Sequence, residues 1–182
     1  MLELAILGFL AEGPLHGYEL RRKVTQLSGY TRPVSDGSLY PAINRLVRDG
    51  LAERHAQVGT AAPRNTLTLT TSGRRDLERR LRKPAEVEIT DLTRFLVVLA
   101  FLSLLPDADE RDQVLRRRLE FLEQPASFFY DGDTPLRQRD LTDPYRQGLF
   151  VIAKATSTAE RRWLHQQLGE AGDRSAERDI AR

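Results

Sequence analysis

Residues 35–46 read SDGSLYPAINRL, and Asp49-Gly50-Leu51 follow shortly after them. Leu39, Ile43 and Leu46 recur at the spacing of one helix face, which predicts a helix that buries this stripe and ends near residue 49. Gly50 is suited to the left-handed conformation that closes many helices. The opposite face would carry mostly small, hydrogen-bonding or cationic side chains, namely Gly37, Ser38, Pro41, Asn44, Arg45 and Arg48.

Two shorter helices are expected before this stretch. Residues 2–10 place apolar side chains at helical spacing, and Gly13-Pro14 ends that helix. Residues 16–27 form the second helix, with Leu20, Val24 and Leu27 on one face.

A β-hairpin and a further helix are expected after it. Residues 51–54 and 65–70 read as two strands, the second with regular alternation of Leu and Thr, and residues 59–63 form the loop between them. Ser72 is the predicted N-cap of a helix that runs to about Lys83. Three helices followed by a two-stranded hairpin predict a winged helix-turn-helix.

The second half of the chain is predicted to be all-helical. Pro84 and the acidic residues up to 88 mark the boundary. Helices are expected at about 92–105, capped by Thr90 or Asp91, and at about 107–124, opened by a capping box of Asp107 with Glu110. Asp143-Pro144 opens a last helix that ends at Gly169. The fold class is therefore mainly α, with a winged helix-turn-helix in residues 1–83, a helical dimerisation domain in 84–169 and a polar, disordered tail in 170–182.

The charge is divided unevenly between these halves. Residues 1–83 hold 14 Arg and Lys against 8 Asp and Glu, whereas residues 84–182 hold 14 against 18. A first half of net charge +6 and a second of −4 indicate that the first half meets a polyanion. The excess of Arg can also reflect a base-composition bias, because 25 of the 28 basic residues are Arg.

Several function classes are excluded by composition. Without Cys there is no disulfide, thiolate metal site or Cys nucleophile, and the three His never occur in a metal-ligand spacing. Neither a nucleophile elbow nor a phosphate-binding glycine loop is present, so we expect no enzyme and no cofactor. The longest apolar run, residues 95–105, is too short to span a bilayer, and a cytoplasmic location is expected.

Two motifs resemble the PadR family of transcriptional regulators. The first is Gly13-Pro14-Leu15-His16-Gly17-Tyr18-Glu19-Leu20, preceded by Ile6-Leu7-Gly8, and the second is residues 37–46, GSLYPAINRL. The resemblance extends to about residue 168 and is with the subfamily that has a longer, virulence-activator-like helical C-terminal domain. It implies a homodimer that binds a pseudo-palindromic operator in double-stranded DNA and most often represses transcription.

The predicted DNA contacts combine the outward face of the helix with this resemblance: Tyr18, Ser35, Gly37, Ser38, Tyr40, Pro41, Asn44, Arg45, Arg48 and Arg64. Asn44 can pair with adenine, and an Arg can bind guanine bidentately. Arg48 is expected to contact only phosphates, and Arg64 to enter a minor groove. Tyr18 and Tyr40 can each pack a ring and donate a hydroxyl to DNA. His16 is expected to cap or pack and not to bind a ligand.

The hairpin departs from the family pattern at one point. Asn65-Thr66-Leu67 stands where relatives usually have a basic residue and two tyrosines, so the wing carries little charge beyond Arg64. A winged-helix module that binds a protein partner and not DNA is the alternative that this departure leaves open.

The dimer contacts are predicted in the second half. They are Phe95, Leu99, Leu102, Leu149, Ile152 and Trp163. The aromatic residues there are expected to fill the helical domain and its dimer contact, although they could also line a pocket for an effector of unknown identity: Phe128, Phe129, Tyr130, Tyr145, Phe150 and Trp163.

Overall fold

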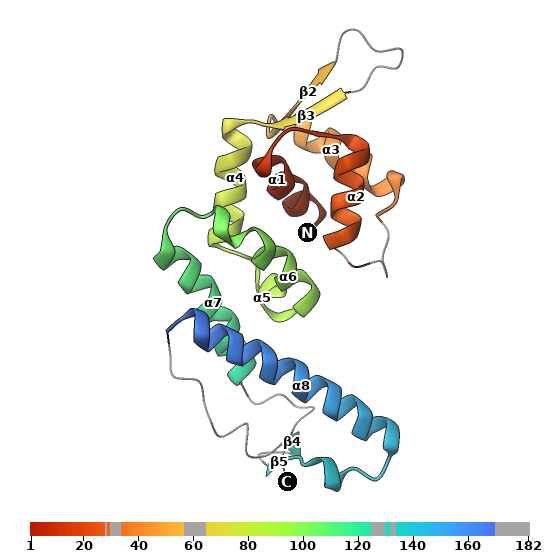
Figure 1. Ribbon diagram of the computed structural model, residues 1–182, viewed down its shortest axis with the longest axis vertical. Helices are drawn as coiled ribbons and strands as arrows, with labels where there is room; N and C mark the ends of the chain where they lie inside the picture. The colour runs from red at the N-terminus through yellow and green to blue at the C-terminus, as the bar shows by residue number, and fades with distance from the viewer. Residues whose placement is uncertain (28, 30–33, 57–64, 125–129, 132–133, 170–182) are drawn as a thin grey trace. The chain divides into compact units, whose positions relative to one another are not determined.

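The computed structural model describes residues 1–27, 29, 34–56, 65–124, 130–131 and 134–169. They divide between two compact units, Met1–Val114 and Leu115–Arg182. The first contains α1 (Leu2–Glu12), β1 (Leu15–His16), α2 (Gly17–Leu27), α3 (Asp36–Arg48), β2 (Ala52–Ala56), β3 (Asn65–Leu69) and α4 (Thr71–Arg82). This order confirms the predicted winged helix-turn-helix (Figure 1).

The sheet of this unit has three strands and not the expected two. Its order is β1-β3-β2, with both pairs antiparallel. Leu15 lies opposite Leu67, and Arg54 on β2 lies opposite the same Leu67 from the other side. The hairpin β2–β3 forms the wing, and β1 ties the start of α2 to it.

The core of this unit lies among the helices. Leu7, Leu20, Leu39, Leu77 and Leu81 are each fully buried, and they come from α1, α2, α3 and α4. Gly50, with φ of +69°, follows α3 as the sequence predicts. The stripe of α3 is buried as its spacing indicated, and so are Leu20 and Val24 of α2, whereas Leu27 is only half-buried.

The N-cap of α4 differs from the expected residue. Thr70 Oγ1 accepts a hydrogen bond from the backbone N–H of Gly73 at 2.9 Å and donates to the carbonyl of Gly50 at 2.7 Å. The prediction of Ser72 was wrong because the helix begins at Thr71, and the Ser72 hydroxyl accepts from Arg75. Thr70, directly after β3, thus caps the start of α4 and also supplies a donor to the Gly50 carbonyl.

The first unit continues beyond Lys83. It includes α5 (Glu86–Thr90), α6 (Leu92–Phe101), the 3₁₀ turn η1 (Leu102–Leu104) and the beginning of α7 (Ala108–Glu123). Asp91 caps α6, as one of the two predicted candidates, but α6 ends at Phe101 and not near residue 105. The Phe101 ring packs edge-on against Phe9 of α1, with ring centroids 5.0 Å apart. In their packing, α5 and α6 belong with the first unit. The boundary after Lys83, between a DNA-binding and a dimerisation domain, stays a prediction.

The expected capping box at the start of α7 forms only in part. Asp107 Oδ1 accepts from the N–H of Asp109, whereas Glu110 accepts from Nε of Arg82 on α4. This hydrogen bond from Arg82 to Glu110 raises the pKa of the Arg82 guanidinium above its ordinary value. Glu110 thus joins α7 to α4 and does not close its own helix start.

The second unit consists mainly of the rest of α7 and of α8 (Pro144–Gln167). The short strands β4 (Tyr130–Asp131) and β5 (Thr134–Pro135) and the 3₁₀ turn η3 (Gln138–Asp140) precede α8. Asp143 caps α8 through the N–H groups of Tyr145 and Arg146, as predicted. Arg118, only 2% exposed, binds both carboxylate oxygens of Glu160 at 2.7 and 2.9 Å, which pairs α7 with α8. The predicted tail at 170–182 lies outside the described residues.

Candidate nucleic-acid interface

The outward face of α3 is the polar surface that the sequence predicts. Leu39, Ile43 and Leu46 are at most 1% exposed, and the opposite side is open to solvent. The exposed side carries Ser35, Gly37, Ser38, Pro41, Asn44, Arg45 and Arg48. The side chains of its first turn are small, so little stands between the helix and an approaching partner.

Pro41 lies inside α3 and not at its start. The helix begins at Asp36, five residues before this proline. A proline at this position gives no hydrogen bond to the carbonyl four residues earlier. The side chain of Ser38 supplies a local contact in the first turn, donating to the Ser35 carbonyl at 2.9 Å.

A groove of about 660 Å³ runs beside α3. Its floor includes Ile43 of α3 and Leu67 of β3, and its sides bear polar groups from five elements, β1, α2, α3, β2 and β3. Tyr18 is 71% exposed and Tyr40 is 44% exposed, with the Tyr40 ring lying against Gly17. The groove residues are His16, Gly17, Tyr18, Glu19, Tyr40, Ile43, Asn44, Arg54, Asn65 and Leu67. Both tyrosines therefore line one surface together with Asn44.

The three wing residues that differ from the family pattern, Asn65-Thr66-Leu67, lie in this groove or beside it. Leu67 is buried, and the Thr66 hydroxyl lies 3.4 Å from Nδ1 of His16. The backbone N–H of His16 donates to Oε2 of Glu19 at 2.9 Å, so His16 joins the start of α2 to the sheet. Among the described residues no group of three or more His, Asp and Glu could hold a metal ion.

Arg54 is a groove residue that sequence reasoning missed. It is exposed on β2, and its Nη2 donates to Oδ1 of Asn44 at 2.9 Å. Residues directly opposite in neighbouring strands share a sheet face, so Arg54 lies on the same face as the buried Leu67. An Arg in register with inward-facing leucines, beside the predicted helix, is the signal that could have found it.

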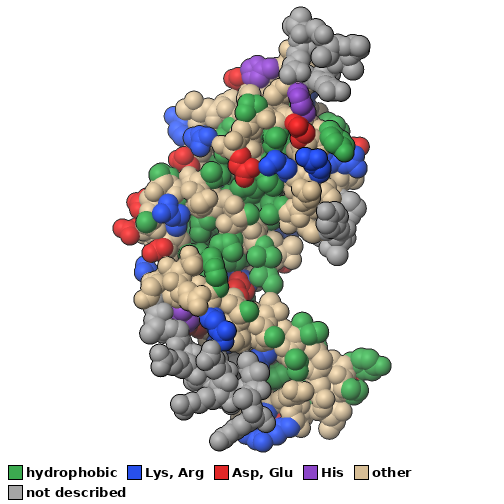
Figure 2. Space-filling model, viewed as in Figure 1, with side chains coloured by type: hydrophobic (Ala, Val, Ile, Leu, Met, Phe, Trp, Pro, Cys, Tyr) green, Lys and Arg blue, Asp and Glu red, His purple; other side chains and the backbone are tan. Residues whose placement is uncertain are grey.

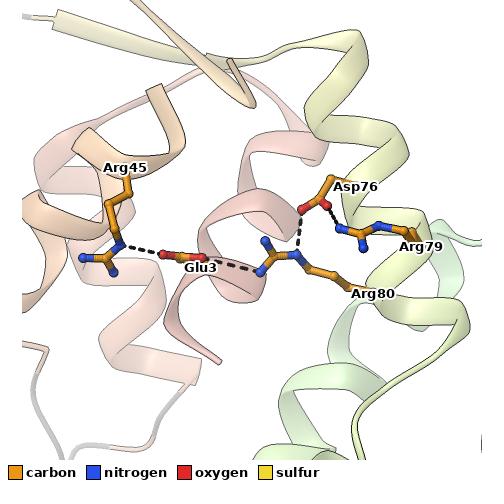
Figure 3. A network of polar contacts seen from close by, with 5 residues as sticks. All are labelled: Glu3, Arg45, Asp76, Arg79 and Arg80. Carbon is orange, nitrogen blue, oxygen red and sulfur yellow. Dashed lines mark hydrogen bonds and ion pairs between the residues drawn. The ribbon is translucent and has the colours of Figure 1, made fainter. Parts of the chain in front are cut away.

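Arg45 is engaged in a network that reaches two other helices. Its Nε donates to Oε1 of Glu3 on α1 at 2.9 Å, and Oε2 of Glu3 lies 3.5 Å from Nη1 of Arg80 on α4. Arg80 also binds Asp76, which in turn pairs with Arg79 (Figure 3). Arg45 thus holds α3 against the scaffold, while half of its side chain stays exposed.

The remaining cations near α3 lie beside carboxylates. Arg48 pairs with Asp49 at 3.1 Å, and Arg21 of α2 with Asp36 at 3.3 Å. Figure 2 shows Lys and Arg side chains over α2 and α3 with Asp and Glu side chains among them. These exposed pairs contribute little to stability and can exchange a carboxylate for another anion.

Other predicted residues lie elsewhere or are not described. Arg64, the 59–63 loop, Phe128 and Phe129 lie outside the described residues. Phe95 and Leu102 are buried within a single chain, and Leu99 is half-buried. Exposed apolar side chains do occur on α8, where Tyr145, Leu149, Ile152 and Trp163 face solvent. Phe150 is buried in the second unit, as expected for a core residue. In the described part of the chain, α8 and the other helices are too short or too polar to span a bilayer.

Comparison with known proteins places the groove and α3 in a known domain. Residues 6–79 match the family described as the transcriptional regulator PadR-like family. The negative transcriptional regulator PadR of Bacillus subtilis (strain 168) is 25% identical over 133 residues, which are 70% of this chain and 73% of that protein. An uncharacterized 37.1 kDa protein in transposon TN4556 of Streptomyces fradiae is 38% identical over 77 residues, 42% of this chain, which spans only 21% of that relative.

The fold was also compared with solved structures. Bacillus subtilis PadR in complex with operator DNA aligns with a TM-score of 0.45 and 22% identity, covering 92% of this chain and 98% of that chain. The predicted family is confirmed by the match to residues 6–79, which span α1 to α4 apart from their ends. Residues 6–79 thus match the PadR-like family of transcriptional regulators, the family that the sequence motifs predict.

Proposed function

We propose that this chain regulates transcription by placing α3 in the major groove of double-stranded DNA. The observation that carries the proposal is the exposed, hydrogen-bonding face of α3 beside a groove lined by two tyrosines, Asn44 and Arg54. A helix of this width fits the major groove, where amide and guanidinium groups can reach base edges. The net charge of +6 on residues 1–83 favours a polyanionic partner.

The contacts divide by role. Asn44 is positioned at mid-helix to read a base, whereas Ser35, Ser38 and the hydroxyls of Tyr18 and Tyr40 suit phosphate oxygens. The small Gly37 and the flat ring of Pro41 permit close approach of the helix. Arg45 and Arg48 can each give up a carboxylate partner for a phosphate.

The protein acts as a homodimer in this proposal. The exposed apolar side chains of α8, Leu149, Ile152 and Trp163, are the contacts available to a second copy, and Leu99 remains a partly open candidate. A two-fold dimer presents its recognition helices about 34–36 Å apart, or a multiple of it, and so fits a pseudo-palindrome. The Bacillus subtilis relative is named a negative regulator, which supports repression as the sign of control.

Gel-shift titration tests this function. The probe is duplex DNA from the intergenic region upstream of the protein's own gene, and a shuffled duplex of equal length is the control. Preferential binding of the upstream duplex is expected, and if each subunit neutralises ~4 phosphates, the slope of log affinity against log salt is about −7 for the dimer. Absence of any shift, or a slope near zero, contradicts DNA binding and favours a module that binds a protein partner. Repeating the titration with candidate small molecules tests for an effector.

A further inference from the structure

The amide of Asn44 is held in one orientation by the wing. Arg54 Nη2 donates to Oδ1 of Asn44 at 2.9 Å. A guanidinium group has only donors, so the atom that it contacts must be the amide oxygen and cannot be the amide nitrogen. The Nδ2 amino group of Asn44 therefore points away from Arg54, toward whatever else meets this side of α3.

This orientation changes what Asn44 can recognise. An Asn that reads adenine uses its oxygen to accept from N6 and its nitrogen to donate to N7. In this protein one of the two lone pairs of the oxygen already accepts from Arg54. The pair then presents N–H groups from Asn44 Nδ2 and from the rest of the guanidinium, so that donors outnumber the one acceptor position left. Guanine offers two acceptors in the major groove, O6 and N7, whereas adenine offers one acceptor and one donor. A surface on which donors predominate matches the two acceptors of guanine better than it matches adenine, whose N6 amino group is a further donor.

Both side chains lie where such a contact is possible. Asn44 and Arg54 are exposed, and both line the groove that also contains Tyr18 and Tyr40. Arg54 reaches this position because β2 places it on the sheet face shared with Leu67, against which α3 packs. Since neither side chain is buried, their replacement leaves the core intact.

We propose that Arg54 determines specificity by fixing Asn44, so that the two side chains act as one donor pair that reads guanine in each half-site. This rests on the proposed function, in which α3 enters the major groove. The pairing of Asn44 with adenine that the sequence suggests applies to an amide that has no partner of its own.

Selection from a pool of duplexes with a randomised central segment tests the proposal with the full chain. The base pair at which Asn44→Ala flattens the preference is the one that Asn44 reads. At that pair the unaltered protein is expected to favour guanine over adenine roughly tenfold, and Arg54→Gln to shift the preference toward adenine, because a released amide can accept as well as donate. Arg54→Lys, which still only donates, is expected to retain guanine.

Arg75→Gln is the matched control. Arg75 is an exposed arginine on α4 whose Nη2 contacts Ser72, and it does not line the groove. It removes the same charge, so it is expected to weaken binding slightly and to leave every base preference unchanged. Thermal unfolding curves verify that each variant is folded before selection.

The outcomes separate the two proposals. Enrichment of adenine at the Asn44 position by the unaltered protein, or an unchanged preference in Arg54→Gln, overturns the role of Arg54, while specific enrichment keeps the proposed function. A loss of guanine preference in Arg54→Lys also overturns it. If the unaltered protein enriches no sequence, both proposals fail.

Discussion

At Gly73 the first turn of α4 passes the backbone of Leu51, and there is no room for a side chain. A Cβ at this position would overlap the carbonyl oxygen of Leu51, a backbone atom that cannot rotate away. We expect Gly73→Ala to lower the free energy of unfolding by about 2 kcal/mol or more, since overpacking forces the backbone to shift. Urea denaturation followed by circular dichroism measures this change.

Gly148→Ala is the control for the same substitution. A Cβ at Gly148 would meet nothing within 4 Å, and the residue lies inside α8. Alanine is favoured over glycine in a helix by about 1 kcal/mol, so this variant is expected to be as stable as the unaltered protein or more so. Equal losses in both variants would mean that the close approach at Gly73 is not the cause.

Residues differ in how far the sequence reveals them. Leu39, Ile43 and Leu46 could be predicted as buried because helical periodicity is a local property. The partner of Arg45 could not, because Glu3 is 42 residues away, and the hydrogen bond from Arg54 to Asn44 depends on how β2 packs beside α3. Pairing between distant segments depends on tertiary packing, which no single stretch encodes.

Among the elements, α4 depends on a cap supplied from outside the helix. Thr70 bonds both the Gly73 N–H and the Gly50 carbonyl, whereas Ser72 contacts only an exposed Arg75. Thr70→Ala is expected to destabilise the protein by about 1–2 kcal/mol, and Ser72→Ala by less than about 0.5 kcal/mol. Thermal denaturation of both variants, side by side, checks this order. The reverse order would restore Ser72 as the cap.

The network in Figure 3 joins three helices, and its two carboxylates differ in burial. Asp76 is 11% exposed and receives Arg79 and Arg80, whereas Glu3 is 27% exposed and receives Arg45 and Arg80. We expect Asp76→Asn to cost about 1–2 kcal/mol, because hydrogen bonds to charged groups are worth more when shielded. Glu3→Gln is expected to cost less than about 1 kcal/mol, because ion pairs that water can reach contribute little to stability. Chemical denaturation at low and high salt measures both, and a larger loss for Glu3→Gln would contradict the ranking.

The elements that the sequence missed are the shortest. β1 has two residues and cannot show alternation, so nothing in it predicts a third strand. α5 has five residues and begins two residues after Pro84, where the acidic composition indicated a domain boundary. Such elements form because their neighbours hold them, whereas α3 and α8 carry their own start and stop signals.

At the scale of the whole molecule, composition does not reveal that α6 packs within the first unit. The apolar sequence of α6 predicted that a second copy would cover some of it; Phe95, Val98 and Phe101 are buried within one chain, while Leu96 is 49% exposed. A Cβ at Gly8 would lie 2.5 Å from the Phe101 ring, so α1 and α6 are in close contact. Periodicity showed that this helix must be covered and gave no information on which surface covers it. The dimer role of α8 stays a prediction.

Two shortened chains test that role and the boundary together. A chain cut after Lys83 loses Phe95, Val98 and Phe101, and since each buried side chain of this kind contributes about 1.5–3 kcal/mol, it is expected to aggregate or unfold well below the full chain. A chain cut after Arg117 keeps the whole first unit, ends α7 on two arginines that suit a helix C-terminus, and is expected to fold.

The chain cut after Arg117 lacks α8, so it should sediment as a monomer while the full chain sediments as a dimer. It should also bind a half-site weakly, since the linked second contact is lost. Sedimentation velocity at micromolar concentration measures all three proteins. A dimer formed by the chain cut after Arg117 would place the interface in the first unit, and a stable, well-folded chain cut after Lys83 would show that α6 is dispensable to it.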